Sequence, residues 1–142
     1  MGGFLDRIAA AGGSFFMLLG RLALAAIFVP SGFGKLSHID TFAHSLAARG
    51  VPMSGLMAVI GACVEFFGGL AIVLGLKTRY AALVMAIFTA VAALIAHRFW
   101  QVEGPTHEAQ YIQFMKNIAI IGGFLCLFAA GPGALAMDRR RR

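Results

Sequence analysis

The stretch GACVEFFGGLAIVLGL, residues 61–76, decides the fold. It closes an apolar run from about residue 53 to 76, which is long enough to cross the hydrocarbon core of a bilayer as one helix. A single acid, Glu65, lies near the middle of that run. An ionised carboxylate is costly at this depth. The sequence therefore predicts a membrane span and, inside the protein, a polar contact that compensates the charge.

Three further apolar runs have similar length, at about 14–34, 80–97 and 117–136. Of the 142 residues, 60% are hydrophobic and only 13% are charged, whereas an ordinary soluble domain carries about 25% charged residues. The four runs take up most of the chain. We therefore expect a single membrane domain over residues 1–142, an all-α integral membrane four-helix bundle.

The basic residues predict how the bundle is oriented. Much of the net charge of +6 comes from the tail at 138–142, which follows an apolar helix and contains four consecutive arginines. Such a tail is typical of a topology signal, so nucleic acid is not an expected partner. Counting Lys and Arg on each side places both termini and the turn at residues 77–79 in the cytoplasm. The loops at about 36–52 and 98–116 would then face outward, and the first is predicted to contain a short helix lying in the membrane interface with Asp40 as its N-cap.

Several glycines are positioned for close helix packing. Gly61 and Gly68 lie four residues before and three after Glu65, a spacing that places them on one helix face, and Gly69 follows directly. Small residues on a helix face let a second membrane helix approach closely. Gly32, two residues after a proline at the end of the first span, has the same expected role. The face of Glu65 is therefore predicted to point into the bundle.

Depth in the membrane suggests a partner for Glu65. Arg21 lies within the first span, about three residues from its centre, which is roughly 4 to 5 Å along a helix. An arginine side chain can bridge that offset, so we expect an intramembrane ion pair between Arg21 and Glu65. Two interpretations stay open: the pair holds two helices in register, or Glu65 is a functional group.

A second polar set is predicted nearer the outer surface. Lys35 ends the first span, His97 ends a stripe of alanines on the third, and Lys116 with Asn117 begins the fourth. With alternating topology all four reach the same level, where they could bind a polar headgroup such as a quinone ring. His97 could exchange a proton there, because its ordinary pKa is near 6.5. The alternative is that these side chains only extend to water.

Other motifs with known chemistry are not found in the sequence. It has no CxxCH sequence, no paired histidines spaced for haem, no glycine-rich phosphate loop and no Ser/His/Asp pattern. No residues are spaced as a metal site, so no metal is expected. Whether the protein is an enzyme stays open, with Glu65 and His97 as the candidate catalytic residues.

The segments LLGRLALAAIFVPSGFGKLSHID, GACVEFFGGLAIVLGLKTRYAAL, AHRFW and FMKNIAIIGGFLCLFAAGPGALAMDRR resemble, in this order, the DoxX family, most closely its YphA-like inner-membrane members. The family pattern has an arginine in the first helix, a glycine and a lysine closing it, a glutamate before Gly-Gly in the second and a histidine ending the third. The matching residues here are Arg21, Gly32, Lys35, Glu65, Gly68, Gly69 and His97. The start of the fourth helix departs slightly, with FMKN in place of an FWKN-like motif.

The resemblance implies a multi-pass protein of the bacterial inner membrane. Family members include a small subunit of a thiosulfate:quinone oxidoreductase and a component associated with thiol-handling proteins, while many relatives have no assigned activity. It therefore implies a membrane subunit or partner in quinone- or thiol-linked redox chemistry, with quinone as the cofactor and an oxidoreductase as the partner. The alternatives are a non-enzymatic interaction or assembly module, which could be a homo-oligomer, and a small transporter or proton path through Glu65.

Overall fold

The structure, a computed structural model, describes residues 3–138 and contains only helices and their connections in that range. Four helices are long and apolar enough to cross a membrane, which confirms the expected all-α membrane bundle. The elements are α1 (Phe4–Ser37), α2 (Ile39–Ala48), α3 (Ser54–Leu74), α4 (Thr78–Ala96), the short 3-10 helix η1 (Phe99–Gln101) and α5 (Gly104–Ala130).

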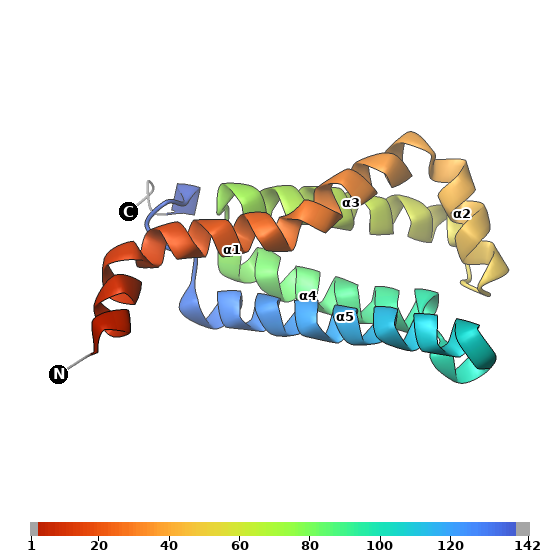
Figure 1. The fold of residues 1–142 in the computed structure, drawn as a ribbon. Coiled ribbons are helices and arrows are strands. Elements are labelled where there is room, and N and C mark those ends of the chain that lie inside the picture. The colour runs from red at the N-terminus through yellow and green to blue at the C-terminus, as the bar shows by residue number, and fades with distance from the viewer. Residues whose placement is uncertain (1–2, 139–142) are drawn as a thin grey trace.

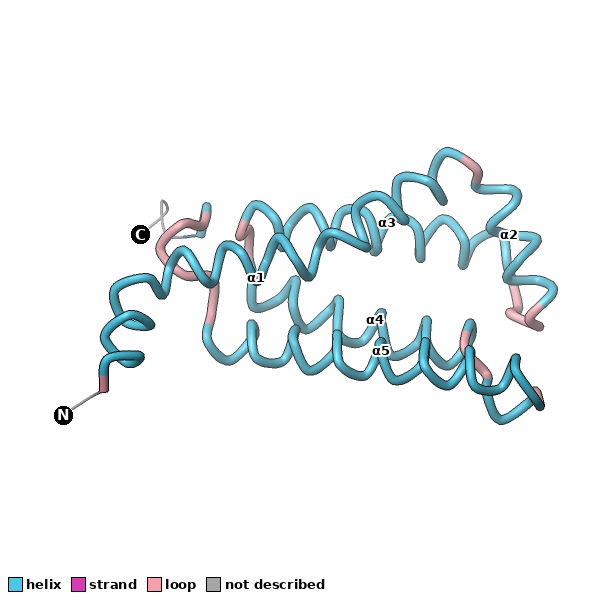
Figure 2. The backbone as a smooth tube through the Cα atoms, in the orientation of Figure 1, coloured by secondary structure: helices cyan, strands magenta, loops and turns pink. Residues whose placement is uncertain are grey.

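The four long helices form two pairs (Figure 1). α1 packs along α3, and α4 packs along α5, while α3 and α4 join the pairs. The short helix α2 lies across one end of the bundle and packs on α3. The connections are short and lie at the two ends (Figure 2). We call these the α2 end and the turn end, the latter after the tight turn between α3 and α4.

Two predicted helix boundaries are corrected by the structure. The fourth span was expected at about 117–136, but α5 begins at Gly104 and ends at Ala130. Pro105 at its start is well suited to a first helical turn, because its fixed φ fits and its missing N–H is not needed there. At the other end Gly131 has φ 83°, which ends the helix. The expected outer loop at 98–116 is thus largely helical.

The first helix is longer than the predicted 14–34. Its 34 residues span roughly 51 Å at 1.5 Å per residue, against about 30 Å for the hydrocarbon core. The first turns of α1 bend away from the bundle axis (Figure 1). The short helix expected within 36–52 is confirmed as α2, although it begins after His38 and has Asp40 in its first turn rather than as the N-cap.

Glycines set the register of α1 against α3. A Cβ added to Gly32 would lie 2.6 Å from the backbone nitrogen of Phe66, and one added to Gly69 would lie 3.1 Å from the Cγ2 of Val29. The distance at Gly32 leaves no room for a side chain, so the two helices meet at backbone contact there, whereas at Gly69 a neighbouring side chain would only have to shift. Gly68 lies against the flexible side chain of Met85 of α4, whereas a Cβ at Gly61 would make only ordinary contacts.

The hydrophobic core joins all four long helices. Its aromatic centre is the contact between Phe28 of α1 and Phe124 of α5, with ring centroids 5.5 Å apart. The buried residues of the cluster are Ala25, Phe28, Ile72, Ala82, Met85, Ala86, Phe124 and Leu127. Because five of these eight residues are alanine or phenylalanine, the helices approach closely at the alanines and are separated by aromatic rings elsewhere.

After α5 the described chain folds back over the turn end as the segment 131–138, which we call the C-terminal segment. Its contacts with α1 and with the α3–α4 turn place it at the same end as the first half of α1. The side of the membrane on which this end lies stays a prediction. The arginines of the basic tail, residues 139–142, lie outside the described residues.

Candidate functional site

Glu65 lies at the centre of a three-helix contact near the α2 end. Its side chain is 5% exposed, and its Oε2 accepts a hydrogen bond from the Nζ of Lys35 in a salt bridge between α3 and α1. The same Nζ lies 5.0 Å from the ring centroid of Phe42 on α2, within cation–π range. One ammonium group thus ties α1, α2 and α3 together.

The expected ion pair between Arg21 and Glu65 is therefore replaced by Lys35 and Glu65. The register explains the difference. Gly32 lies against Phe66, so the end of α1 lies beside Glu65, while Arg21 reaches Gly75 at the C-terminal cap of α3. Arg21 and Lys35 point to the same side of α1, but four helical turns separate them.

Arg21 is buried at the turn end. It is 1% exposed, and its NH2 donates a hydrogen bond to the backbone oxygen of Leu135 in the C-terminal segment. Its Nε and NH1 have no hydrogen-bond partner among the residues the structure describes. The guanidinium lies directly against Gly75, where any Cβ would collide with it. It therefore meets the negative end of the α3 dipole.

His97 lies at the α2 end, where it caps the C-terminus of α4. Its half-buried imidazole Nδ1 is 2.9 Å from the Oε1 of Gln110 on α5. With that oxygen as acceptor, Nδ1 carries the hydrogen and Nε2 is left as a proton acceptor. The predicted alanine stripe leading to His97 does face the bundle, since Ala86 and Ala93 are buried.

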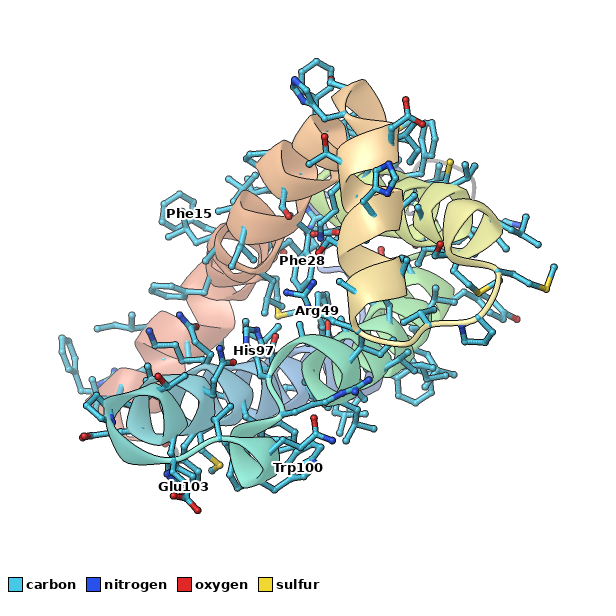
Figure 3. The ribbon with its side chains drawn as sticks, turned by 90° about the vertical axis from the view of Figure 1, so that its right-hand side faces the viewer. Phe15, Phe28, Arg49, His97, Trp100 and Glu103 are labelled. Carbon is cyan, nitrogen blue, oxygen red and sulfur yellow. The ribbon has the colours of Figure 1, made fainter. Side chains whose placement is uncertain are left out.

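An open pocket of about 250 Å³ lies beside this histidine. Two arginines line it, Arg49 after α2 and Arg98 after α4, together with the partner of His97, Gln110. Viewed onto this end, the side chains of Arg49 and His97 lie near the middle of the bundle mouth (Figure 3). The full lining is Ala48, Arg49, Ile95, Ala96, Arg98, Gln101, Val102 and Gln110, which includes no acidic residue.

The four predicted ligand-binding residues do not form one set. Lys35 is held by Glu65, and His97 is held by Gln110. Lys116 is exposed, and the Nδ2 of Asn117 donates to the backbone oxygen of its own helix at residue 113. Of the four, only His97 is bonded to a residue of the pocket.

Sequence reasoning missed the pocket residues Arg49, Arg98 and Gln110. The reason is the misplaced start of the last helix, because a loop at 98–116 gives Gln110 no fixed direction. A helix beginning at Pro105 would have been the signal, since it carries Gln110 back toward the end of α4. Among residues 3–138, no three His, Cys, Asp or Glu side chains group as a metal site.

The comparisons with known proteins agree with this architecture. The DoxX family model matches residues 16–98. The inner membrane protein YphA of Escherichia coli is 37% identical over 124 residues, 87% of this chain and 89% of the relative. The inner membrane protein YqjF of the same organism is 38% identical, again over 87% and 89%.

A more distant relative extends the likeness beyond Escherichia coli. An uncharacterized membrane protein of Mycobacterium tuberculosis, Rv3486, is 29% identical over 84% of this chain and 77% of its own length. No solved structure matches. The family model, the two inner-membrane relatives and the four spanning helices lead to one conclusion: the chain belongs to the DoxX family and is a multi-pass protein of the inner membrane.

Proposed function

We propose that this protein is a membrane subunit for redox chemistry that holds the headgroup of a quinone in the pocket beside His97. The observation that carries the proposal is the lining of that pocket. Arg49, Arg98 and Gln101, which carry hydrogen-bond donors, line a small open space that reaches Gln110, the hydrogen-bond partner of His97.

The residues present fit a quinone ring in size and chemistry. Pockets for drug-sized ligands measure about 300 to 1,000 Å³, so 250 Å³ suits a single substituted ring rather than a whole lipid. Ile95 and Val102 supply apolar surface for the ring faces, and the two guanidinium groups supply donors for carbonyl oxygens. The isoprenoid tail would leave the pocket along the apolar outer surface of the bundle.

Each polar group has a distinct role in this proposal. A bound quinone supplies the two-electron chemistry, and an oxidoreductase partner supplies or receives the electrons. Arg49 and Arg98 orient the ring by donating hydrogen bonds to its oxygens. The Nε2 of His97 accepts or returns the proton of a ring hydroxyl, and Gln110 holds the imidazole in the tautomer that allows this.

Orientation is part of the proposal. The count of Lys and Arg in the sequence, in which the tail at 139–142 makes the excess, favours the cytoplasmic side for the turn end and for both termini. The pocket then opens at the outer face of the inner membrane. A partner oxidoreductase would dock against α2 or η1, the two short elements at that face.

Native mass spectrometry of the protein extracted gently from its own membrane tests the proposal first. We expect a retained quinone, a copurifying oxidoreductase or both. Binding of a short-chain quinone should then weaken about tenfold in Arg98→Gln and in His97→Gln, which is about 1.4 kcal/mol. Lys116→Gln, an exposed cation outside the pocket, is the matched control and should bind as the wild type does.

Equal quinone binding by all three variants, or no saturable binding at all, would contradict the proposal. A homo-oligomer without quinone would then favour the interaction or assembly module. The proton path makes a separate prediction, which is that Glu65→Gln folds normally yet abolishes pH-driven flux in liposomes.

A further inference from the structure

The turn end contains an anion-binding arrangement that the quinone proposal does not use. The α4 N-terminus is capped by the carboxylate of Asp138. Its Oδ1 accepts from the backbone N–H of Lys77 at 2.6 Å, and its Oδ2 accepts from the N–H of Thr78 at 2.8 Å and from the Thr78 hydroxyl at 3.0 Å. Two amides and a hydroxyl at a helix N-terminus are the donors that phosphate groups typically meet.

Positive side chains surround this position from three elements. Arg21 of α1 is 1% exposed, bonds the backbone of Leu135 three residues before Asp138, and keeps two buried N–H groups without a partner among the described residues. Arg79 of α4 lies against Gly131, where the C-terminal segment begins. Lys77 is exposed at the turn. Asp138 is the acid bound by these donors.

Besides the Asp138 carboxylate contacts and the bond from Arg21 to Leu135, two more hydrogen bonds hold the C-terminal segment, and a competing anion must break them to lift it. Ala134 N–H donates to the Ser14 hydroxyl, and Asp138 N–H donates to the backbone oxygen of Gly75. In residues 131–138 only the last two form part of a helical turn, and none lies in a membrane-spanning helix. Lifting it would expose the amides of the α4 N-terminus together with the Arg21 guanidinium.

We propose that this position, made by the α4 N-terminus and Arg21, is a phosphate-binding site that the chain closes with its own Asp138 carboxylate. The phosphate of an anionic phospholipid such as phosphatidylglycerol, or free inorganic phosphate, competes with Asp138 for the same donors. Arg21 then gains partners for the Nε–H and NH1 groups, which are unpaired while the segment is closed. The helix dipole favours either anion alike, so the hydrogen bonds that Arg21 gains are what favours the exchange.

The test compares Asp138→Asn with Asp40→Asn in the full-length protein. Asp138→Asn removes the internal negative charge and keeps one side-chain oxygen that can accept from the α4 N-terminus. Asp40→Asn removes the same charge on exposed α2 at the opposite end and is the matched control. Each variant is reconstituted into phosphatidylcholine bilayers that contain about 20% phosphatidylglycerol. The number of phosphatidylglycerol molecules retained per protein is then counted by native mass spectrometry.

We expect Asp138→Asn to retain at least about threefold more phosphatidylglycerol than Asp40→Asn, and Arg21→Met to lose that gain when combined with it. Deuterium exchange is the second readout. The amides of Ala134 and Asp138, which lose their acceptors when the segment lifts, should exchange faster in wild-type protein with phosphatidylglycerol than with phosphatidylcholine alone, while the Lys77 amide stays protected by the phosphate. If millimolar inorganic phosphate reproduces the change, the source is the free ion rather than the lipid.

Two results would overturn the inference. The first is equal lipid retention by Asp138→Asn and Asp40→Asn. The second is exchange at Ala134 and Asp138 that neither lipid nor inorganic phosphate alters. Neither result bears on quinone binding at the opposite end, so this proposal and the proposed function fail independently.

Discussion

The two ends of the bundle treat a buried cation in opposite ways. At the α2 end, Lys35 is partly exposed and paired with a carboxylate, Glu65, so the charges are balanced by a side chain of the neighbouring helix. At the turn end, Arg21 is almost completely buried and bonds only a backbone oxygen, with two N–H groups left over. The charge pair at the α2 end stabilises the contact between α1 and α3. At the turn end, the Nε and NH1 of Arg21 are hydrogen-bond donors without an acceptor among the described residues.

Replacing Lys35 should break the first arrangement most severely. Lys35→Met leaves the Glu65 carboxylate buried and unpaired, which typically costs about 3 to 5 kcal/mol. The double variant Lys35→Met/Glu65→Leu should recover most of the lost free energy of unfolding, because both charges are gone. Unfolding midpoints in mixed micelles measure both changes.

Lys116→Met is the control for this cycle, since Lys116 is an exposed lysine near the same end and should change stability by less than about 0.5 kcal/mol. Additive effects of the two substitutions at Lys35 and Glu65 would show that the salt bridge contributes nothing to folding.

The glycine contact that sets the register should be nearly as sensitive. Gly32→Ala places a Cβ 2.6 Å from the backbone nitrogen of Phe66, so α1 must move away from α3 at an expected cost of about 1 to 3 kcal/mol. Gly34→Ala is the matched control two residues away, because nothing lies within 4 Å of its added Cβ. That change should be neutral or stabilising by up to about 1 kcal/mol. Equal unfolding midpoints for the two variants would contradict the backbone contact.

The cap at the turn end should have a smaller effect. Asp138→Ala removes the acceptor for the amides of Lys77 and Thr78, and loss of an N-cap typically costs about 0.5 to 2 kcal/mol. Faster deuterium exchange confined to the first turn of α4 would confirm the local character of the loss. An equal change after Asp40→Ala would show that the effect is one of net charge.

Arg21 should be the least costly of the buried ions to remove. Arg21→Met gives up one hydrogen bond to Leu135 but also removes two buried N–H groups without partners, and the two effects partly offset each other. We expect a loss below about 2 kcal/mol, less than for Lys35→Met. The opposite ranking of the two unfolding midpoints would show that the ends do not differ in this way.

The sequence was sufficient to predict the four spans, the short helix α2 and the burial of Glu65. These features depend on the length of apolar runs and on the free-energy cost of a charge in lipid. Both can be read from a short stretch of sequence without knowing which helices pack together. The partner of Glu65 could not be predicted in the same way. Arg21 and Lys35 lie on one side of α1, and only the axial register of α1 against α3 decides between them.

That register is fixed by contacts between distant residues, such as Gly32 with Phe66. The glycine pattern indicated that helices would make close contacts. It did not indicate which residues of the neighbouring helix would lie against each glycine. The pocket was missed for a related reason. Its lining comes from four short segments around the α2 end, and the start of α5 is too polar to be recognised from hydropathy as part of a spanning helix.

The hydrogen bond from Arg21 to Leu135 joins residues 114 positions apart, whereas Lys35 and Glu65 are 30 apart. At a synthesis rate of about 5 to 20 residues per second, the carboxylate follows its lysine within roughly 2 to 6 s, while Leu135 follows Arg21 only after roughly 6 to 23 s. Arg21 is therefore synthesised well before its hydrogen-bond partner, Leu135, exists. The C-terminal segment therefore completes the contacts of α1 only at the end of synthesis.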